Sequence, residues 1–232
     1  MKNFISLIIV AVLLASCGGG GGGGKKTYVR SLSIVENGDV TNYYFTYNGN
    51  EISAVSINYP NELPIELRIT KSGSNINITD VSSQNGDHVQ YVVQQNYIRK
   101  SISDETDQTN YNYTNLNELL QIVYPDGGQD NFTWVDGNIK SIRTDPENTT
   151  VTYQYGAKIN NTNLEINMIL AGHFDIGLFK DTYFGVSTKN LPTSNSNYNY
   201  TYNFDDHKNL MGITATPKQG GNTITYSIIY RD

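Results

Sequence analysis

The chain has 232 residues, with 22 acidic against 16 basic side chains and a formal net charge of −6 at pH 7. A mildly acidic chain without a basic cluster argues against binding to nucleic acid or to anionic lipid. Its one cysteine, Cys17, leaves no disulfide and no cysteine metal site within the chain. Packing and hydrogen bonds alone must therefore hold the domain together.

The first 17 residues are typical of a bacterial lipoprotein signal. Lys2 supplies a positive start, residues 4–13 form an apolar run too short to span a bilayer stably, and Leu-Ala-Ser-Cys follows at 14–17. The last four residues resemble a lipobox, which implies cleavage before Cys17, diacylglycerol on its thiol and a fatty acid such as palmitate on its new amine. An ordinary secretory signal with a chance cysteine is the alternative. Acyl chains contribute about 0.8 kcal/mol per buried methylene, so the anchor would be effectively permanent.

Residues 18–27 are read as a flexible glycine-rich tether between Cys17 and the domain. A phosphate-binding loop is excluded, because Lys26 stands where Ser or Thr is needed and no strand precedes the glycines. Residue 18 is Gly rather than the Asp that resembles an inner-membrane retention signal, which favours the outer membrane; its periplasmic and cell-surface faces stay open. Loss of Lys2 with the signal leaves 15 basic against 22 acidic residues, a net charge of −7.

A strand–turn–strand unit at residues 43–55 recurs at 131–142 and, more loosely, at 198–213. Each copy has alternating aromatics, a turn rich in Asn, Asp and Gly, and a second strand. Turn signals continue along the chain at intervals of about ten to thirteen residues, which leaves one strand of normal length between neighbours. They lie at residues 37–39, 48–50, 59–64, 72–74, 85–87, 104–107, 115–117, 126–128, 136–138 and 146–148.

Such close turns permit only antiparallel neighbours, since a parallel crossover needs a dozen or more residues. Residues 28–232 are therefore predicted to form a single all-β domain, an antiparallel meander closed into a barrel or curled strongly. Apolar residues alternate, as in Tyr43, Phe45 and Tyr47, so one face is packed and the other is wet. The 18 tyrosines are expected to line the inner face with their hydroxyls at the rim; a platform for carbohydrate is the alternative.

The strand pattern breaks around residues 162–178, where we expect one inserted helical segment. Apolar residues at three and four spacings predict a helix over 163–170, capped by Thr162 or Asn163 and ending towards Gly172 and Gly177. It should cover an open end or face of the sheet as a second layer. Residues 190–199 are predicted to be a loop, and three strands are expected at 198–204, 210–216 and 223–230.

Several of these features together resemble the DUF4595 lipoproteins, a family of unknown function with a porin-like fold. They are the lipobox, the Tyr-x-Tyr units with Gly-Asn-x-Ile, the segment Asn-Thr-Asn-Leu-Glu-Ile-Asn at 161–167, Thr-Lys-Asn-Leu-Pro at 188–192 and Tyr-Thr-Tyr-Asn at 200–203. The resemblance implies a many-stranded antiparallel barrel whose outer strands, rich in Asn, Ser and Thr, face water. It supplies no catalytic residues.

Chemical motifs are few. The strongest candidate for a metal or acid–base site is His173 with Asp175 and Asp181, although an irregular segment end carries polar residues in any case. Asp205, Asp206 and His207 fill a turn of the repeated unit, so turn chemistry accounts for them. The sequence points to no catalytic constellation, no metal site and no cofactor. We expect any binding site to lie where the repeat fails, between residues 160 and 199.

Two functions remain open. The favoured one is a non-catalytic envelope lipoprotein, not an enzyme, that is anchored to the membrane and binds a glycan or protein ligand as a monomer. The alternative is a hydrolase acting on glycan or lipid through His173 and nearby carboxylates.

Overall fold

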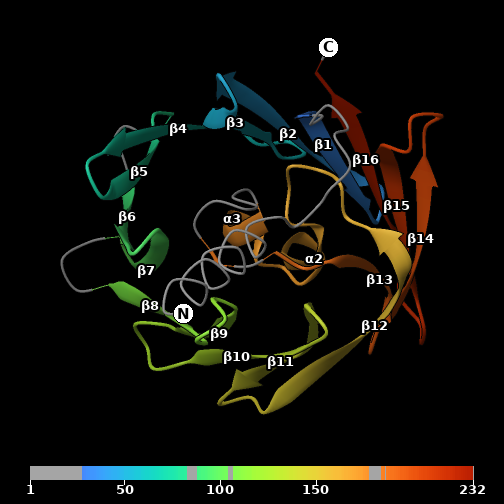
Figure 1. Ribbon diagram of the computed structural model, residues 1–232. Helices are drawn as coiled ribbons and strands as arrows, with labels where there is room; N and C mark the ends of the chain where they lie inside the picture. Colours follow the sequence, from blue (N-terminus) through green and yellow to red (C-terminus); the bar gives the residue numbers. More distant parts are fainter. Residues whose placement is uncertain (1–27, 83–87, 104–106, 178–183, 186, 232) are drawn as a thin grey trace, which may run out of the picture.

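A computed structural model describes residues 28–82, 88–103, 107–177, 184–185 and 187–231, which form one closed β-barrel (Figure 1). Its strands are β1 Val29–Glu36, β2 Asp39–Asn48, β3 Glu51–Asn58, β4 Ile65–Ser72, β5 Asn75–Asp80, β6 His88–Gln94, β7 Tyr97–Ile102, β8 Gln108–Tyr113, β9 Leu119–Val123, β10 Gln129–Val135, β11 Asn138–Asp145, β12 Thr149–Ile159, β13 Asn190–Asn195, β14 Tyr198–Phe204, β15 Leu210–Pro217 and β16 Ile224–Tyr230.

Each strand pairs in antiparallel fashion with the next along the chain, and β1 pairs with β16 to close the barrel. The closing register runs from Val29 opposite Tyr230 to Val35 opposite Thr225. The predicted all-β meander is confirmed, and of the two predicted forms the closed barrel is the one observed. Closure removes the free strand edges at which an antiparallel sheet would pair with other chains.

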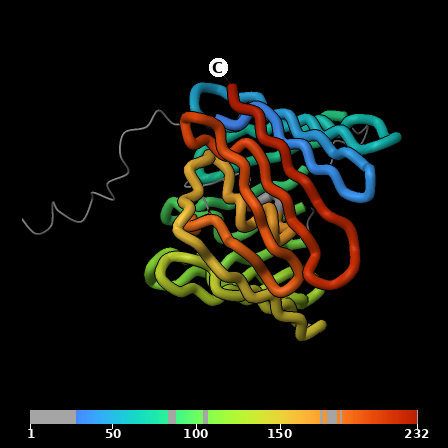
Figure 2. The backbone as a smooth tube through the Cα atoms, turned by 90° about the vertical axis from the view of Figure 1, so that its right-hand side faces the viewer, coloured from blue at the N-terminus to red at the C-terminus, as the bar shows by residue number. Residues whose placement is uncertain are grey.

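Because the number of antiparallel strands is even, the first strand begins and the last strand stops at the same end of the barrel. At the end that we call the terminal end, β1 begins, β16 stops, even-numbered strands finish and odd-numbered strands start. The backbone N–H of Arg231 donates to the carbonyl of Tyr28 there, and Figure 2 shows the last strand ending beside the first. The opposite end, the distal end, carries the turns that lead from odd-numbered to even-numbered strands. The described chain therefore enters and leaves at one end.

Side chains alternate between an apolar inner face and a polar outer face. In β2, Tyr43 and Phe45 are 9 % and 6 % exposed, whereas Tyr44 between them is 46 % exposed. Outward positions that are exposed carry mostly hydroxyl, amide and charged groups, for example Thr46, Glu66, Arg68, Thr133, Lys140, Thr152, Gln154 and Thr201. The period of two in the sequence thus places the core inside the barrel and presents polar groups outside.

An aromatic hydrogen bond recurs at the terminal end of the barrel. Near the end of an even-numbered strand, a Tyr or Trp donates to a backbone carbonyl within the first three residues of the preceding strand. We call these donors the aromatic clamps. Among the described residues the pairs are Tyr47 with Val29, Tyr113 with Ile98, Trp134 with Leu119, Tyr155 with Ile139, Tyr202 with Pro192 and Tyr230 with Leu210.

The clamps tie these six hairpins across their open ends, where the two strands are not joined by a turn. The distance from the Tyr47 hydroxyl to the Val29 carbonyl is 2.6 Å, and the other acceptors, such as Ile98 and Leu119, are buried as well. Burial raises the pKa of Tyr47 above its ordinary value, and likewise those of Tyr113, Tyr155, Tyr202 and Tyr230. The predicted inner-face tyrosines with rim hydroxyls are confirmed in these strands.

The connection from β12 to β13 includes the described residues 160–177, 184–185 and 187–189, which we call the plug. Two short helices, α2 Ile166–Leu170 and α3 Phe174–Gly177, lie inside the ring of strands (Figure 1). The predicted inserted helical segment is confirmed, but the helix begins at Ile166 rather than at residue 163. It covers the inner face of the sheet, one of the predicted positions, because the apolar surface to be buried is on the inside.

Asn163 fixes the start of the plug. The prediction that Thr162 or Asn163 caps the helix is wrong. The Asn163 Oδ1 accepts from the backbone N–H of Val29 at 2.9 Å and its Nδ2 donates to the Tyr47 hydroxyl at 3.0 Å. Glu165 occupies the cap position without a side-chain capping bond. The Asn163 side chain therefore bonds to β1 and β2, whereas in an isolated helix it would be free to cap the first turn.

Further contacts reach other sides of the wall. The Phe184 ring packs edge-on against Tyr91 of β6 and Tyr111 of β8, with ring centroids 6.0 and 5.2 Å apart. The Nδ2 of Asn167 lies 3.4 Å from the Tyr155 hydroxyl of β12. With Asn163 on β1 and β2, these contacts join the plug to well-separated parts of the strand order. The plug therefore acts as the second layer of the core.

The prediction of a loop at residues 190–199 is wrong, because residues 190–195 form β13. Leu191 and Pro192 are buried, and Pro192 stands opposite Tyr155 at an irregular point in the register with β12. A proline lacks the N–H that a regular ladder needs, and such a residue is tolerated where the ladder is interrupted. The Pro192 carbonyl instead accepts the Tyr202 clamp.

The remaining predicted elements agree with the structure where it describes them. The strands expected at 198–204, 210–216 and 223–230 are β14, β15 and β16. Asp205 accepts from the N–H groups of His207 and Asn209 and from the Asn209 side chain, which lowers its pKa and confirms turn chemistry there. The turn expected at 85–87 and the first three residues of the turn expected at 104–107 lie outside the described residues. No described helix has the length and apolar character needed to cross a membrane.

The fit of the plug against the wall can be tested at Gly185. This residue has φ of +83°, and a Cβ there would lie 2.2 Å from the Asn117 carbonyl oxygen. Gly38 has nearly the same φ, +89°, but its Cβ would meet open space. Gly185→Ala should therefore lower the free energy of unfolding by about 1–3 kcal/mol more than Gly38→Ala does, measured by urea denaturation. Equal losses in the two variants would contradict the packed plug.

Candidate functional site

The structure places one of the three residues predicted to form a site. His173 lies between α2 and α3 in the plug, and its ring centroid is 5.7 Å from that of Phe132 in β10. Asp175 belongs to α3, but its side chain is not described, and Asp181 lies outside the described residues. The carboxylate that faces His173 is instead Asp130, at 3.6 Å from Nε2.

Asp130 is the centre of a small polar cluster on the inner wall. Its Oδ2 accepts from the Tyr124 hydroxyl and its Oδ1 from the Thr144 hydroxyl, each at 2.6 Å. The side chains of His173 and Asp130 are 14 % and 8 % exposed, so the contact lies between plug and wall. A buried carboxylate is costly unless hydrogen bonds satisfy it, and here both oxygens are satisfied.

This cluster joins β9, β10 and β11 to the plug. Both oxygens of Asp130 are held by wall residues, and the ring of His173 is packed against Phe132, so the groups are arranged to fix the plug in position. Within the described residues, no three His, Cys, Asp or Glu side chains stand close enough to hold a metal ion. The geometry thus favours a docking contact.

A second polar layer secures the base of the plug beside β11 and β13. Asn138 and Asn190 bond reciprocally, with the Asn190 N–H 2.8 Å from the Asn138 Oδ1 and the Asn138 Nδ2 3.2 Å from the Asn190 Oδ1. Thr188 donates to the carboxylate of Glu165, which is 5 % exposed. These contacts fix both ends of the plug at the terminal end of the barrel.

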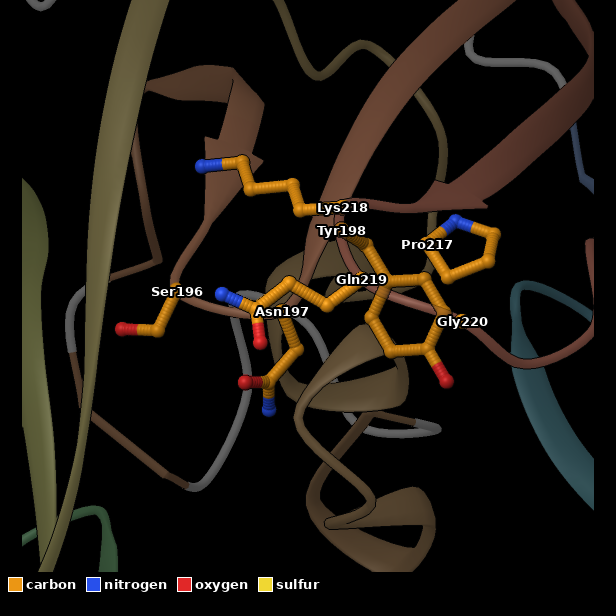
Figure 3. A pocket seen from close by; sticks show the side chains of 7 residues that line it. All are labelled: Ser196, Asn197, Tyr198, Pro217, Lys218, Gln219 and Gly220. Carbon is orange, nitrogen blue, oxygen red and sulfur yellow. The ribbon is translucent and has the colours of Figure 1, made fainter.

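A pocket of about 370 Å³ opens at the distal end, between the β13–β14 and β15–β16 turns. The two turns are joined by the Lys218 N–H, which donates to the Asn197 carbonyl at 2.8 Å. Figure 3 shows the Tyr198 ring beside Pro217, with the Lys218 and Gln219 side chains extending away from the ring on its other side. The lining residues are Ser196, Asn197, Tyr198, Pro217, Lys218, Gln219 and Gly220.

The pocket combines an aromatic face with several polar groups. Asn197 and Gln219 each offer an amide donor and acceptor, Ser196 a hydroxyl and Lys218 an ammonium. Tyr198 is half-buried and packs against the core, so its ring has a fixed orientation. An apolar ring beside amide groups is the arrangement that recognises a flat, hydroxyl-bearing ligand.

Sequence reasoning missed both Asp130 and the pocket. Asp130 stands two residues before the buried Phe132, so strand periodicity puts its carboxylate on the inner face, which is an unusual place for an unpaired charge. Only residues 196–198 of the pocket fall in the interval 160–199 where a site was expected. Residues 217–220 come from another hairpin, and the barrel register brings Pro217 opposite Tyr198.

Comparisons with known proteins identify solved structures that have a similar fold. A porin-like protein from Bacteroides uniformis ATCC 8492 matches with a TM-score of 0.65 and 13 % identity, over 88 % of this chain and 99 % of that one. A porin-like protein from Bacteroides vulgatus ATCC 8482 matches with a TM-score of 0.62 and 15 % identity over the same shares. No family model matches the sequence, and no curated protein does. The similarity establishes a shared barrel fold.

The docking role of Asp130 gives a direct prediction. In Asp130→Asn, one carboxylate oxygen becomes an NH2 group, which cannot accept the hydroxyl proton of Tyr124 or Thr144. The free energy of unfolding should fall by about 1–3 kcal/mol, because a buried donor loses its acceptor. Asp39→Asn, the same change at the exposed start of β2, should have little effect. Equal urea midpoints for the two variants would show that Asp130 does not hold the structure together.

Proposed function

We propose that the chain is a non-catalytic lipoprotein of the bacterial envelope that binds a ligand at the distal end of its barrel. Cys17 carries the lipid anchor, residues 18–27 form the tether, and the outer membrane is the proposed location. The observation that carries the proposal is the plug. Because described residues of the plug, among them α2 and α3, occupy the interior, the surface available to a ligand is the rim rather than a passage through the barrel.

The outer face of the barrel supports a position in water. A strand that faces lipid carries apolar side chains on its outer positions, whereas exposed outward positions here include Glu66, Arg68 and Lys140. On this proposal the barrel stands beside the membrane and is held there by lipid on Cys17. The likeness to porin-like barrels is then one of architecture rather than of transport.

The distal pocket favours a glycan as the ligand. Tyr198 supplies a ring on which a sugar face can stack, and Asn197 and Gln219 supply paired donors and acceptors for its hydroxyls. The pocket volume of about 370 Å³ is near the lower end of the range for small-molecule sites, which suits one sugar unit of a longer chain.

Binding can be measured by calorimetry with a panel of envelope and dietary oligosaccharides. A chain that begins at Lys25 keeps all sixteen strands and the plug, and is the protein to titrate. One member of the panel should bind, and Gln219→Ala should weaken that affinity about tenfold, as expected for the loss of one or two ligand hydrogen bonds. Asn199→Ala, an exposed amide on the outer face of the neighbouring strand, should leave it unchanged.

Two results would count against this function. If no glycan in the panel produced heat or a thermal shift, the distal pocket would not be a glycan site. If a glycan bound equally well to the Gln219→Ala and Asn199→Ala proteins, binding would lie elsewhere on the barrel. Anchoring is checked separately, by mass spectrometry of the mature N-terminus, where acylated Cys17 is expected and an unmodified residue would exclude the lipid anchor.

A further inference from the structure

Basic side chains scattered along the sequence gather at the terminal end of the barrel. Even-numbered strands finish there and odd-numbered strands start there, so positions far apart in sequence share one rim. Among the described residues, the basic side chains at this end are Arg30, Lys71, Arg99, Lys140, Lys158, Lys189, Lys208 and Arg231. The acidic ones are Glu51, Glu118, Asp136, Glu165, Asp205 and Asp206, and Glu51 is paired with Lys71 at 2.6 Å. Cations therefore outnumber anions at the terminal end.

The distal end has the opposite character. Its described acidic residues are Glu36, Asp39, Glu62, Glu66, Asp80, Asp107, Asp126, Asp130, Asp145 and Glu147. Its described basic residues are Arg143 and Lys218, and Arg143 is paired with Asp145 at 2.9 Å. The net negative charge of the chain thus conceals a barrel with a basic end and an acidic end, a separation that composition alone does not reveal.

Three of the terminal cations are held in place by the aromatic rings of this end. The Arg99 guanidinium lies 4.8 Å from the centroid of Tyr113, and the Lys158 ammonium lies 4.9 Å from that of Phe204. The Arg231 guanidinium lies 4.5 Å from the Tyr28 ring and donates to the Gly49 carbonyl at 3.1 Å. Cation–π contacts restrain long side chains that would otherwise sweep through solvent, so positive charge is fixed at the rim.

Exposed apolar side chains lie at both ends of the barrel, and Leu63 and Val81, 88 % and 47 % exposed, are at the distal end. Leu116, Val135 and Ile159 are 66 %, 53 % and 61 % exposed, and all three lie at turns or strand ends of the terminal end. Val135 and Lys189 are neighbours in space, because the Lys189 N–H donates to the carbonyl of Gly137 in the turn that follows Val135. Mixed apolar and basic side chains are characteristic of surfaces that bind the interface of a bilayer.

We propose that the terminal end of the barrel lies directly on an anionic bilayer surface. The described chain begins at this end, and Cys17 precedes Val29 by only twelve positions in the sequence. The bilayer attracts the basic rim, accepts its apolar tips and repels the acidic distal end. The net negative charge of the chain argues against binding to anionic lipid. In this arrangement, however, only the basic terminal rim meets the membrane.

This contact goes beyond the proposed lipid anchor, because it is made by the barrel itself. It fixes an orientation in which the distal pocket points away from the membrane that holds the protein. A tether alone would leave the domain free to tumble, since a flexible glycine-rich segment of about ten residues spans roughly 17 Å on average.

The contact can be tested with the chain that begins at Lys25, which lacks Cys17 and so separates this proposal from the anchor. Co-sedimentation should show binding to vesicles of phosphatidylglycerol and phosphatidylethanolamine, and much weaker binding to phosphatidylcholine alone. Lys189→Gln should lower partitioning about fivefold, and Lys140→Gln with Lys189→Gln about 30-fold, because each basic residue near the surface contributes about 1 kcal/mol. Arg68→Gln removes the same charge from the outer face in the middle of β4, away from the terminal end, and should leave partitioning unchanged.

Two outcomes would overturn the proposal. One is equal partitioning onto the anionic vesicles and the phosphatidylcholine vesicles, or no binding to either. The other is an equal loss for Lys189→Gln and Arg68→Gln, which would indicate attraction to net charge rather than to one end. Circular dichroism spectra of the variants should match that of the parent chain, which excludes unfolding as the cause of a loss.

Discussion

The structure depends on filling a sixteen-stranded barrel whose inner face is apolar. Barrels of this strand number leave a channel that water fills when the lining is polar. Here the lining includes Phe45, Ile76, Phe132 and Tyr200, each at most 6 % exposed, and water in contact with them would be unfavourable. The plug solves this problem by placing α2 and α3 in the interior. Leu164, Ile166 and Met168 of the plug then complete one core with the wall.

The aromatic clamps and the plug depend on each other at the terminal end. The Tyr47 hydroxyl donates to the Val29 carbonyl and accepts from Asn163, so one group closes a hairpin and positions the plug. The Tyr155 hydroxyl makes the same pair of contacts with Ile139 and Asn167. As a result, the terminal end holds the two ends of the plug, both ends of the described chain and most of the basic side chains. The distal end is left as the separate surface on which the pocket lies.

The repeated strand–turn unit made the fold predictable from the sequence. Regular turns rich in Asn, Asp and Gly specify antiparallel neighbours, and alternating aromatics specify which face is buried. Closure was not predictable, because whether β1 meets β16 depends on strand number and accumulated twist rather than on any local pattern. The loop wrongly assigned at 190–199 shows the same limit, since Pro192 enters a strand only through the irregular register that Tyr155 provides.

The candidate sites were harder to predict than the fold for the same reason. His173 was recognised as unusual, but its partner Asp130 lies forty-three positions away and meets it only across the interior. The pocket combines two turns, at 196–197 and 218–220, that the β14–β15 register brings together. Charge behaved likewise, because Arg30, Lys140 and Arg231 share a rim only when the barrel is closed. Long-range pairing decides each of these features, and local sequence carries little information about it.

Removal of the plug tests the central claim most directly. Ile159 and Asn190 are paired across β12 and β13, so a two-residue Asn-Gly turn can replace residues 160–189 without stretching either strand. If the plug is the second layer of the core, the shortened chain will lose its cooperative thermal transition and bind a dye specific for exposed apolar surface. A shortened chain that unfolds as cooperatively and at the same temperature as the parent would contradict the account.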